Sequence, residues 1–129
     1  MAKEIRGYYI DVINAQCGER TVADELDTYY QMLNCESIEI VRCRVQGREF
    51  LVICDEEGLL KDDKIVSAVD NLGRWMLLGN LFIVGGVDSE GELTGLSEDG
   101  VIYIQDHITA EVTDGKHRAH PVLNNVWWH

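Results

Sequence analysis

Proline is nearly absent from this sequence of 129 residues, in which Pro121 is the single instance. Without a Pro-rich stretch, no linker of that kind divides the chain. A run of about 18 uncharged apolar residues is also missing, which argues against a transmembrane helix. Residues 1–16 lack the apolar stretch of a secretory signal. We therefore expect one compact domain in the cytoplasm.

Cysteine is sparse, and its spacing fits no common metal site. The four cysteines are Cys17, Cys35, Cys43 and Cys54, and none forms a C-x-x-C pair. Without a secretory signal, free thiols are the expected state. Cys43 and Cys54 lie within apolar runs, as buried small hydrophobic residues do. We predict no disulfide framework, no bound metal and no cofactor.

Sequence motifs that carry catalysis are absent. The chain has no P-loop, G-x-S-x-G, H-E-x-x-H or G-x-G-x-x-G motif. The acidic residues from 55 to 63 have the wrong spacing for an EF-hand. We predict that the protein is not an enzyme. A Cys–His or acid–base site remains an alternative, with Cys17, His107 and Asp55 as the residues to test.

Basic residues are few, and they are unevenly distributed along the chain. The chain has 11 basic and 23 acidic residues, for a net charge of −12. Residues 55–114 alone contain 14 acidic and 3 basic side chains. Such a field repels a phosphate backbone, so direct binding to nucleic acid is disfavoured. A basic protein surface is the partner that this charge favours, although acidic charge also serves solubility.

Periodicity in the first half predicts alternating strands and helices. Residues 4–14 are rich in aromatic and β-branched types and predict a strand, with Gly7 as a bulge. A turn at 16–18 and a capping box at 21–24 then predict a helix that ends near Asn34. Residues 37–45 and 48–54, joined by Gln46 and Gly47, predict a β-hairpin.

The second half is predicted in the same way. Apolar residues at helical spacing predict a helix from Asp62 or Asp63 to near Gly73. The apolar run at 81–86 predicts a central strand, and residues 87–96 a polar turn with a short strand. Residues 97–108 suit a strand or a helix, and Ser97 as an N-cap favours the helix.

Together these elements predict an α+β fold in a single small domain. We expect a mixed or antiparallel sheet of about five strands with two or three helices. The domain is expected to span residues 1–108, and residues 109–129 to form a C-terminal tail or extension. The tail is expected to be irregular up to the apolar residues near its end.

Trp127 and Trp128 are the most informative residues of that tail. Leaving a large apolar side chain in water costs about 1.5–3 kcal/mol relative to full burial. They are therefore expected to pack on the domain or on a partner, and the sequence does not choose between the two. Together with the acidic turns they form the predicted partner-binding set: Asp55, Glu56, Glu57, Asp62, Asp63, Asp88, Glu90, Glu92, Trp127 and Trp128.

A small basic cluster offers an alternative ligand site. Arg42, Arg44 and Arg48 lie on one predicted hairpin, and Tyr29 could stack on a nucleotide base there. The competing interpretation is cross-strand pairing of these arginines with Glu39 and Glu49. Cross-strand pairing is the favoured interpretation.

Several stretches resemble a known family. CDEEGLLKD at 54–62 follows an IEIV strand at 38–41, and LGNLFIVG at 78–85 precedes LSED at 96–99. This pattern, over roughly residues 8–108, is similar to a family of small uncharacterised domains found in phages, plasmids and other mobile elements. The resemblance implies no catalytic residues. It implies an accessory gene of a mobile element, often near anti-restriction genes.

These observations lead to four functional hypotheses. The first is a non-enzymatic acidic protein of a phage or mobile element that inhibits a host defence system by engaging a basic nucleic-acid-binding surface. The second is a sponge that sequesters a nucleotide signal near Arg42 and Arg44, and a site between subunits of a homo-oligomer is one form of this hypothesis. The third is a housekeeping interaction module, and the fourth is an enzyme with an unfamiliar site.

Overall fold

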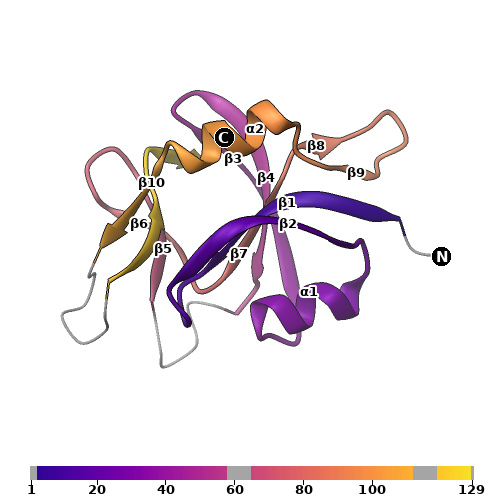
Figure 1. Ribbon diagram of the computed structural model, residues 1–129, viewed down its shortest axis with the longest axis horizontal. Helices are drawn as coiled ribbons and strands as arrows, with labels where there is room; N and C mark the ends of the chain where they lie inside the picture. Colours follow the sequence, from indigo (N-terminus) through magenta and orange to yellow (C-terminus); the bar gives the residue numbers. More distant parts are fainter. Residues whose placement is uncertain (1–2, 58–64, 112–118, 129) are drawn as a thin grey trace.

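The computed structural model describes residues 3–57, 65–111 and 119–128. Twelve strands and two helices lie within these ranges (Figure 1). In chain order they are β1 (Glu4–Asp11), β2 (Gln16–Ala23), α1 (Leu26–Leu33), β3 (Ile38–Val45), β4 (Arg48–Asp55), β5 (Val66–Val69), β6 (Trp75–Leu78), β7 (Leu81–Val84), β8 (Gly86–Val87), β9 (Leu93–Thr94), α2 (Glu98–Gln105), β10 (Ile108–Glu111), β11 (His120–Leu123) and β12 (Val126–Trp128).

The larger sheet has six strands in the order β12-β3-β4-β7-β1-β2, and all its neighbours run antiparallel. Every residue of β7 is buried, which confirms the central strand predicted from the apolar run. The β3–β4 hairpin is confirmed too. Gln46 and Gly47 both have positive φ, as a two-residue turn of this kind requires.

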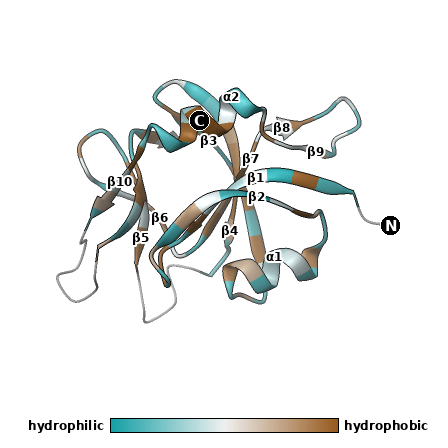
Figure 2. Cartoon of the chain, in the orientation of Figure 1, coloured by the Kyte–Doolittle hydropathy of each residue, from teal (hydrophilic) through white to brown (hydrophobic). Residues whose placement is uncertain are grey.

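Both faces of this sheet are covered, by different elements. One face packs under α2 and a four-stranded sheet of order β10-β11-β5-β6, in which β11 and β5 run parallel. The other face carries α1, whose Tyr29 and Leu33 pack on Leu51, Ile53 and Phe82. Figure 2 shows hydrophobic residues on the inner strands β4 and β7, between these two layers. The result is a small, mostly β domain.

The predicted sheet of about five strands is therefore wrong, because the described residues form three sheets. Residues 16–23 form β2, and not the start of a helix. Their full antiparallel register with β1 outweighs the weak capping box. The helix begins only at Leu26, without a side-chain cap. By contrast α2 is confirmed, with the Ser97 hydroxyl accepting a hydrogen bond of 3.0 Å from the Gly100 amide.

The predicted helix that ends near Gly73 is also wrong where the structure describes it. Residues 66–69 and 75–78 form the β5–β6 hairpin, and Asp62 and Asp63 lie outside the described residues. Gly73, at φ 80°, belongs to the turn of this hairpin. The segment after 108 is not irregular over 108–111 and 119–128, because it supplies β10, β11 and β12 to the two larger sheets.

Candidate functional site: an acidic cleft beside α1

The end of α1 and the end of β4 meet in an open hollow. Asn34 takes the left-handed conformation that ends α1, at φ 52°. The Glu56 amide then donates to the Ser37 carbonyl over 3.3 Å, which holds the turn after β4 against the start of β3. The hollow has a volume of about 590 Å³. Its lining, called here the α1 cleft, consists of Tyr30, Gln31, Asn34, Cys35, Glu36, Asp55 and Glu57.

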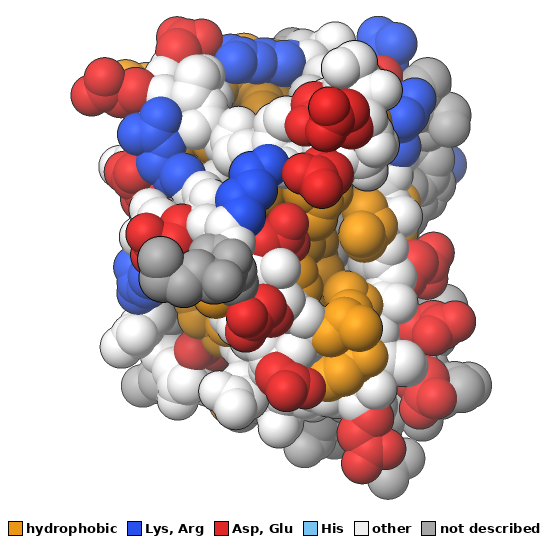
Figure 3. Space-filling model, turned by 90° about the vertical axis from the view of Figure 1, so that its right-hand side faces the viewer, with side chains coloured by type: hydrophobic (Ala, Val, Ile, Leu, Met, Phe, Trp, Pro, Cys, Tyr) orange, Lys and Arg blue, Asp and Glu red, His pale blue; other side chains and the backbone are white. Residues whose placement is uncertain are grey.

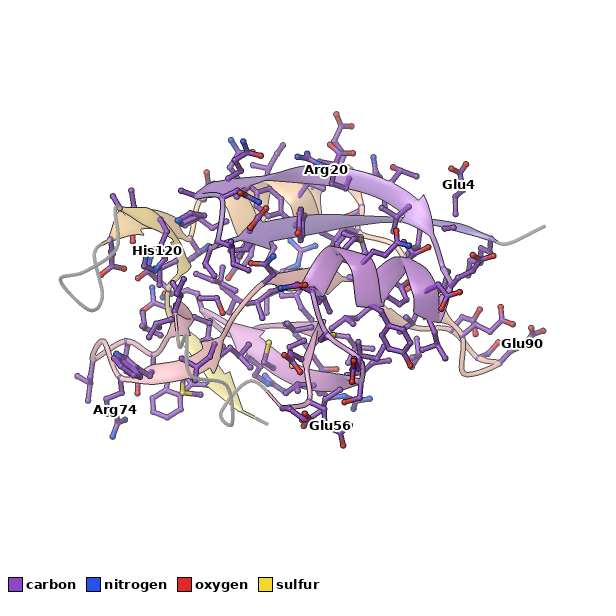
Figure 4. All side chains as sticks on the ribbon, turned by 90° about the horizontal axis from the view of Figure 1, so that it is seen from below. Glu4, Arg20, Glu56, Arg74, Glu90 and His120 are labelled. Carbon is purple, nitrogen blue, oxygen red and sulfur yellow. The ribbon has the colours of Figure 1, made fainter. Side chains whose placement is uncertain are left out.

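Carboxylates dominate the charge of the α1 cleft. Glu36, Asp55 and Glu57 all line it, and the described lining residues include no lysine or arginine. The Asp55 side chain accepts the Glu57 amide over 2.9 Å, which orders the turn that carries both acids. Glu56, which lies between them in the sequence, projects outward in Figure 4. The cleft can therefore accept hydrogen bonds from a cationic side chain.

The second predicted acidic segment lies elsewhere. Asp88, Glu90 and Glu92 form the turn between β8 and β9. The Asp88 carboxylate accepts the amides of Glu92 and Glu90 over 3.0 and 2.8 Å, and these hydrogen bonds lower its pKa. Figure 4 shows Glu90 at one end of the molecule, well separated from Glu56. The acids predicted to act together thus form two surfaces.

The arginines predicted to form one ligand pocket are separated by the sheet. Arg42 and Arg44 share the Glu49 carboxylate at 3.8 and 3.9 Å, as the cross-strand interpretation expects. Arg48 is on the opposite face, where it bonds Asp99 at 2.8 Å and lies over the rings of Phe50 and Tyr103.

Tyr29 also lies apart from the arginines of the predicted ligand pocket. Its ring is buried under α1, and its hydroxyl donates to the Asp24 carboxylate over 2.5 Å. Burial, reinforced by this hydrogen bond, raises the pKa of the phenol. Tyr29 is therefore a core residue, and the predicted nucleotide pocket is not assembled.

Trp127 docks on its own domain and still leaves part of its ring in solvent. It pairs with Arg44 across β12 and β3, and 45% of its surface is exposed. The Arg74 guanidinium lies 5.7 Å from the centre of its ring. Arg74 is held in turn by the buried Asp70 carboxylate, at 2.6 Å. Trp128 belongs to the same strand, and its side chain is not among those that the structure describes.

The residues of the enzymatic alternative do not come together. Cys17 lines a shallow hollow of about 230 Å³, whereas Asp55 lines the α1 cleft. His107 is beside a third hollow, and its Nδ1 is 2.7 Å from the Tyr103 carbonyl oxygen. Across residues 3–57, 65–111 and 119–128, no three His, Cys, Asp or Glu side chains are grouped to hold a metal ion.

Thiol reactivity should separate the buried cysteines from the exposed one. Burial, with a smaller contribution from nearby carboxylates, raises the pKa of Cys43 and Cys54 to about 12. A thiol-reactive disulfide reagent at about pH 8 should modify exposed Cys17 in the folded protein and reach Cys43 and Cys54 only on unfolding. Cys17→Ser should remove the fastest phase and leave the partly exposed Cys35 as the thiol that reacts before unfolding. Fast labelling that survives this substitution and maps to Cys43 or Cys54 would contradict their burial.

The raised pKa values of Cys43 and Cys54 make the stability of the fold depend on pH. Because the folded-state pKa is raised, stability is fully present below the unfolded thiol pKa of about 8.5. It should fall as the pH rises from there towards 12, since the unfolded thiols ionise and the buried ones do not. Urea unfolding at increasing pH measures this slope, and Cys54→Ala should flatten it.

The structure thus defines a class: a small, mostly β domain with two helices, which presents an acidic cleft. No helix within the described ranges is long and apolar enough to cross a membrane. The chain belongs to the family described as a domain of unknown function, DUF3846, whose sequence model matches residues 5–109. No curated protein and no solved structure matches the chain.

Proposed function

We propose that this protein is a non-enzymatic binding protein whose α1 cleft captures a basic surface of another protein. The observation that carries the proposal is the lining of the cleft, where the part of the chain that the structure describes contributes three carboxylates and no cationic side chain. A lysine or arginine entering it would find charge-assisted hydrogen bonds. The net charge of −12 would speed the encounter with a basic partner and repel nucleic acid.

We further propose that the partner is a host defence protein with a nucleic-acid-binding groove. This step rests on the resemblance to domains of phages and mobile elements, and the acidic surface supports it by being complementary to such a groove. A housekeeping interaction module would use the same cleft for a different partner. The identity of the protein that the purified chain captures from host lysate distinguishes the two.

Charge reversal in the α1 cleft should abolish this binding. For Glu36→Lys/Glu57→Lys we expect an affinity loss of at least about tenfold, because both substitutions place like charge against the partner. The matched control is Glu90→Lys/Glu92→Lys, which changes the net charge equally in the separate β8–β9 turn. It should lower only the association rate.

Titration calorimetry at about 50 and about 300 mM salt then compares the three proteins with the captured partner, since screening weakens surface electrostatics. Equal losses of affinity in both variants would mean that the cleft acts only through the net negative charge of the protein and not through specific contacts. Binding that is unchanged in both would reject the proposal.

A nucleotide sponge is not favoured, because Arg42 and Arg44 are on the opposite face of the sheet from Arg48. A thermal-shift screen with cyclic and linear nucleotides tests it directly. A large stabilisation would revive it, since a ligand that binds the folded state raises stability by mass action.

A further inference from the structure

One half of the α1-bearing face of the large sheet is covered by no helix or second sheet within residues 3–57, 65–111 and 119–128. Leu51 and Ile53 of β4 point towards α1, and the register places Arg42 opposite Leu51 and Ile40 opposite Ile53. Side chains directly opposite each other lie on the same face. Arg44 and Trp127, which pair two positions along, share it too. We call Ile40, Arg42, Arg44 and Trp127 the bare half-face.

The bare half-face combines apolar side chains with guanidinium groups, and the Glu49 carboxylate lies on the same face, 3.8 and 3.9 Å from Arg42 and Arg44. Ile40 is 46% exposed and Trp127 45%, and the side chains of Arg42 and Arg44 are 55% and 48% exposed. Arg74 adds a third guanidinium beside Trp127. Tryptophan and arginine are the residue types most enriched at the centres of protein interfaces. The described hollows lie elsewhere, so a small ligand, which needs a concave site, is a poor occupant.

The other half of the same face carries a surface of complementary charge. The sequence has no lysine or arginine between Arg20 and Arg42. Glu25, Leu26 and Asp27 at the start of α1 are all exposed, with Leu26 at 58%. Figure 3, which views the right-hand side of Figure 1, shows hydrophobic side chains in a stripe with acidic and basic side chains beside it.

The strand registers bring these two surfaces to the same end of the sheet. Ala23, just before α1, pairs with Glu4 at the start of β1. Tyr8 and Val52 both pair with Ile83, so the starts of β1 and β4 lie at the same end of the sheet. The hairpin that joins β3 to β4 is at that end, next to Arg44.

We propose that two copies of this chain form a dimer in which the first turn of α1 of each lies on the bare half-face of the other. Glu25 and Asp27 then face Arg42 and Arg44, and Leu26 meets Ile40 and Trp127. Since each copy has one half covered by α1 and one bare half, a two-fold axis makes both contacts at once and closes the assembly.

This inference goes beyond the proposed function and does not depend on it. The α1 cleft is at the opposite end of α1, around Asn34 and Asp55, and stays open in the dimer. Two such clefts on one dimer could engage a two-fold symmetric partner, with the gain in avidity that linked sites give.

The test is mass measurement by light scattering after gel filtration, over about 1 to about 100 µM protein. The wild type should have twice the 14.6 kDa mass of the chain. Arg42→Glu/Arg44→Glu should be monomeric, and so should Glu25→Lys/Asp27→Lys, because each brings like charges together twice. An equimolar mixture of the two variants should restore the dimer, since both contacts in the mixed pair are again between opposite charges.

This rescue separates a lost interface from lost folding. Arg20→Glu, on β2 at the far edge of the sheet, is the matched control and should remain a dimer. A monomeric wild type at the highest concentration, or a mixture that stays monomeric, would overturn the proposal. The Glu36→Lys/Glu57→Lys variant should still form the dimer. The cleft proposal and the dimer proposal can therefore fail independently of each other.

Discussion

Val126→Asp is expected to lower the free energy of unfolding by about 3–5 kcal/mol, the cost of an uncompensated buried charge. Val126 is fully buried in the main core and pairs with Val45, which is also fully buried. A carboxylate there is shielded from water, and Arg48, the next residue in the same cross-strand row beyond Val45, is already paired with Asp99. Urea unfolding followed by far-UV circular dichroism measures the change.

The neighbouring residue provides the control. Trp127 is on the opposite face of β12 beside Arg44 and Arg74, so the carboxylate of Trp127→Asp remains hydrated and near two cations. At concentrations where the chain is monomeric, we expect a loss of about 1 kcal/mol or less, as for other surface substitutions. Equal, small losses in both variants would mean that the last strand is not part of the core.

This strand marks a limit of the sequence analysis. The tail was expected to be irregular up to its apolar end, yet it contains β11, which includes Pro121, a residue that cannot donate to a ladder. In the structure Pro121 pairs with Ala110 of β10, while β11 meets β5 in register only at Leu123. The missing N–H is therefore tolerated, which no local pattern could have indicated.

The β5–β6 hairpin was wrongly predicted as a helix for a different reason. Ile65, Val66, Val69 and Leu72 fit a helical stripe, yet Leu72 is 73% exposed and Ser67, between the supposed contacts, is fully buried. Four consecutive buried residues form a strand covered on both sides, which periodicity cannot distinguish from a helix. Elements with clear turn chemistry or alternation, such as the β3–β4 hairpin, were predicted correctly.

The candidate site was predictable only in part. The acids at 55–57 were evident from the sequence, but the cleft needs Glu36 brought beside them by the contact between Glu56 and Ser37. The separation of Arg42 and Arg44 from Arg48 could have been found. A two-residue turn places position 45 opposite 48, which puts Arg48 on the other face. Arg74 lay just after the wrongly predicted helix, and nothing in the sequence indicated that it would lie beside Trp127.

Phe82→Ala is expected to destabilise the fold by about 3–5 kcal/mol, the range for deleting a buried aromatic ring. Phe82 is fully buried in the central strand β7. Its ring lies 6.1 Å from that of Tyr29, so it joins α1 to the sheet. Denaturant unfolding measures the loss, and Phe82→Leu, which leaves a smaller cavity, should lose less. A loss below about 1 kcal/mol would contradict this packing.

The same ring explains why residue 7 is glycine. The predicted bulge is absent, since β1 pairs with β2 in continuous register. Instead, a Cβ at Gly7 would lie 2.4 Å from Cζ of Phe82 and 2.7 Å from the Ile83 carbonyl oxygen. Gly7→Ala should therefore cost about 1–3 kcal/mol through overpacking.

A double-mutant cycle separates these two clashes. In the Phe82→Ala background, Gly7→Ala should cost less than in the wild type, because the ring is gone, but not zero, because the backbone carbonyl remains. Residues in contact commonly show coupling of about 0.5–3 kcal/mol. Strict additivity would mean that Gly7 is required by the Ile83 backbone alone, and that the Phe82 ring is free to move away.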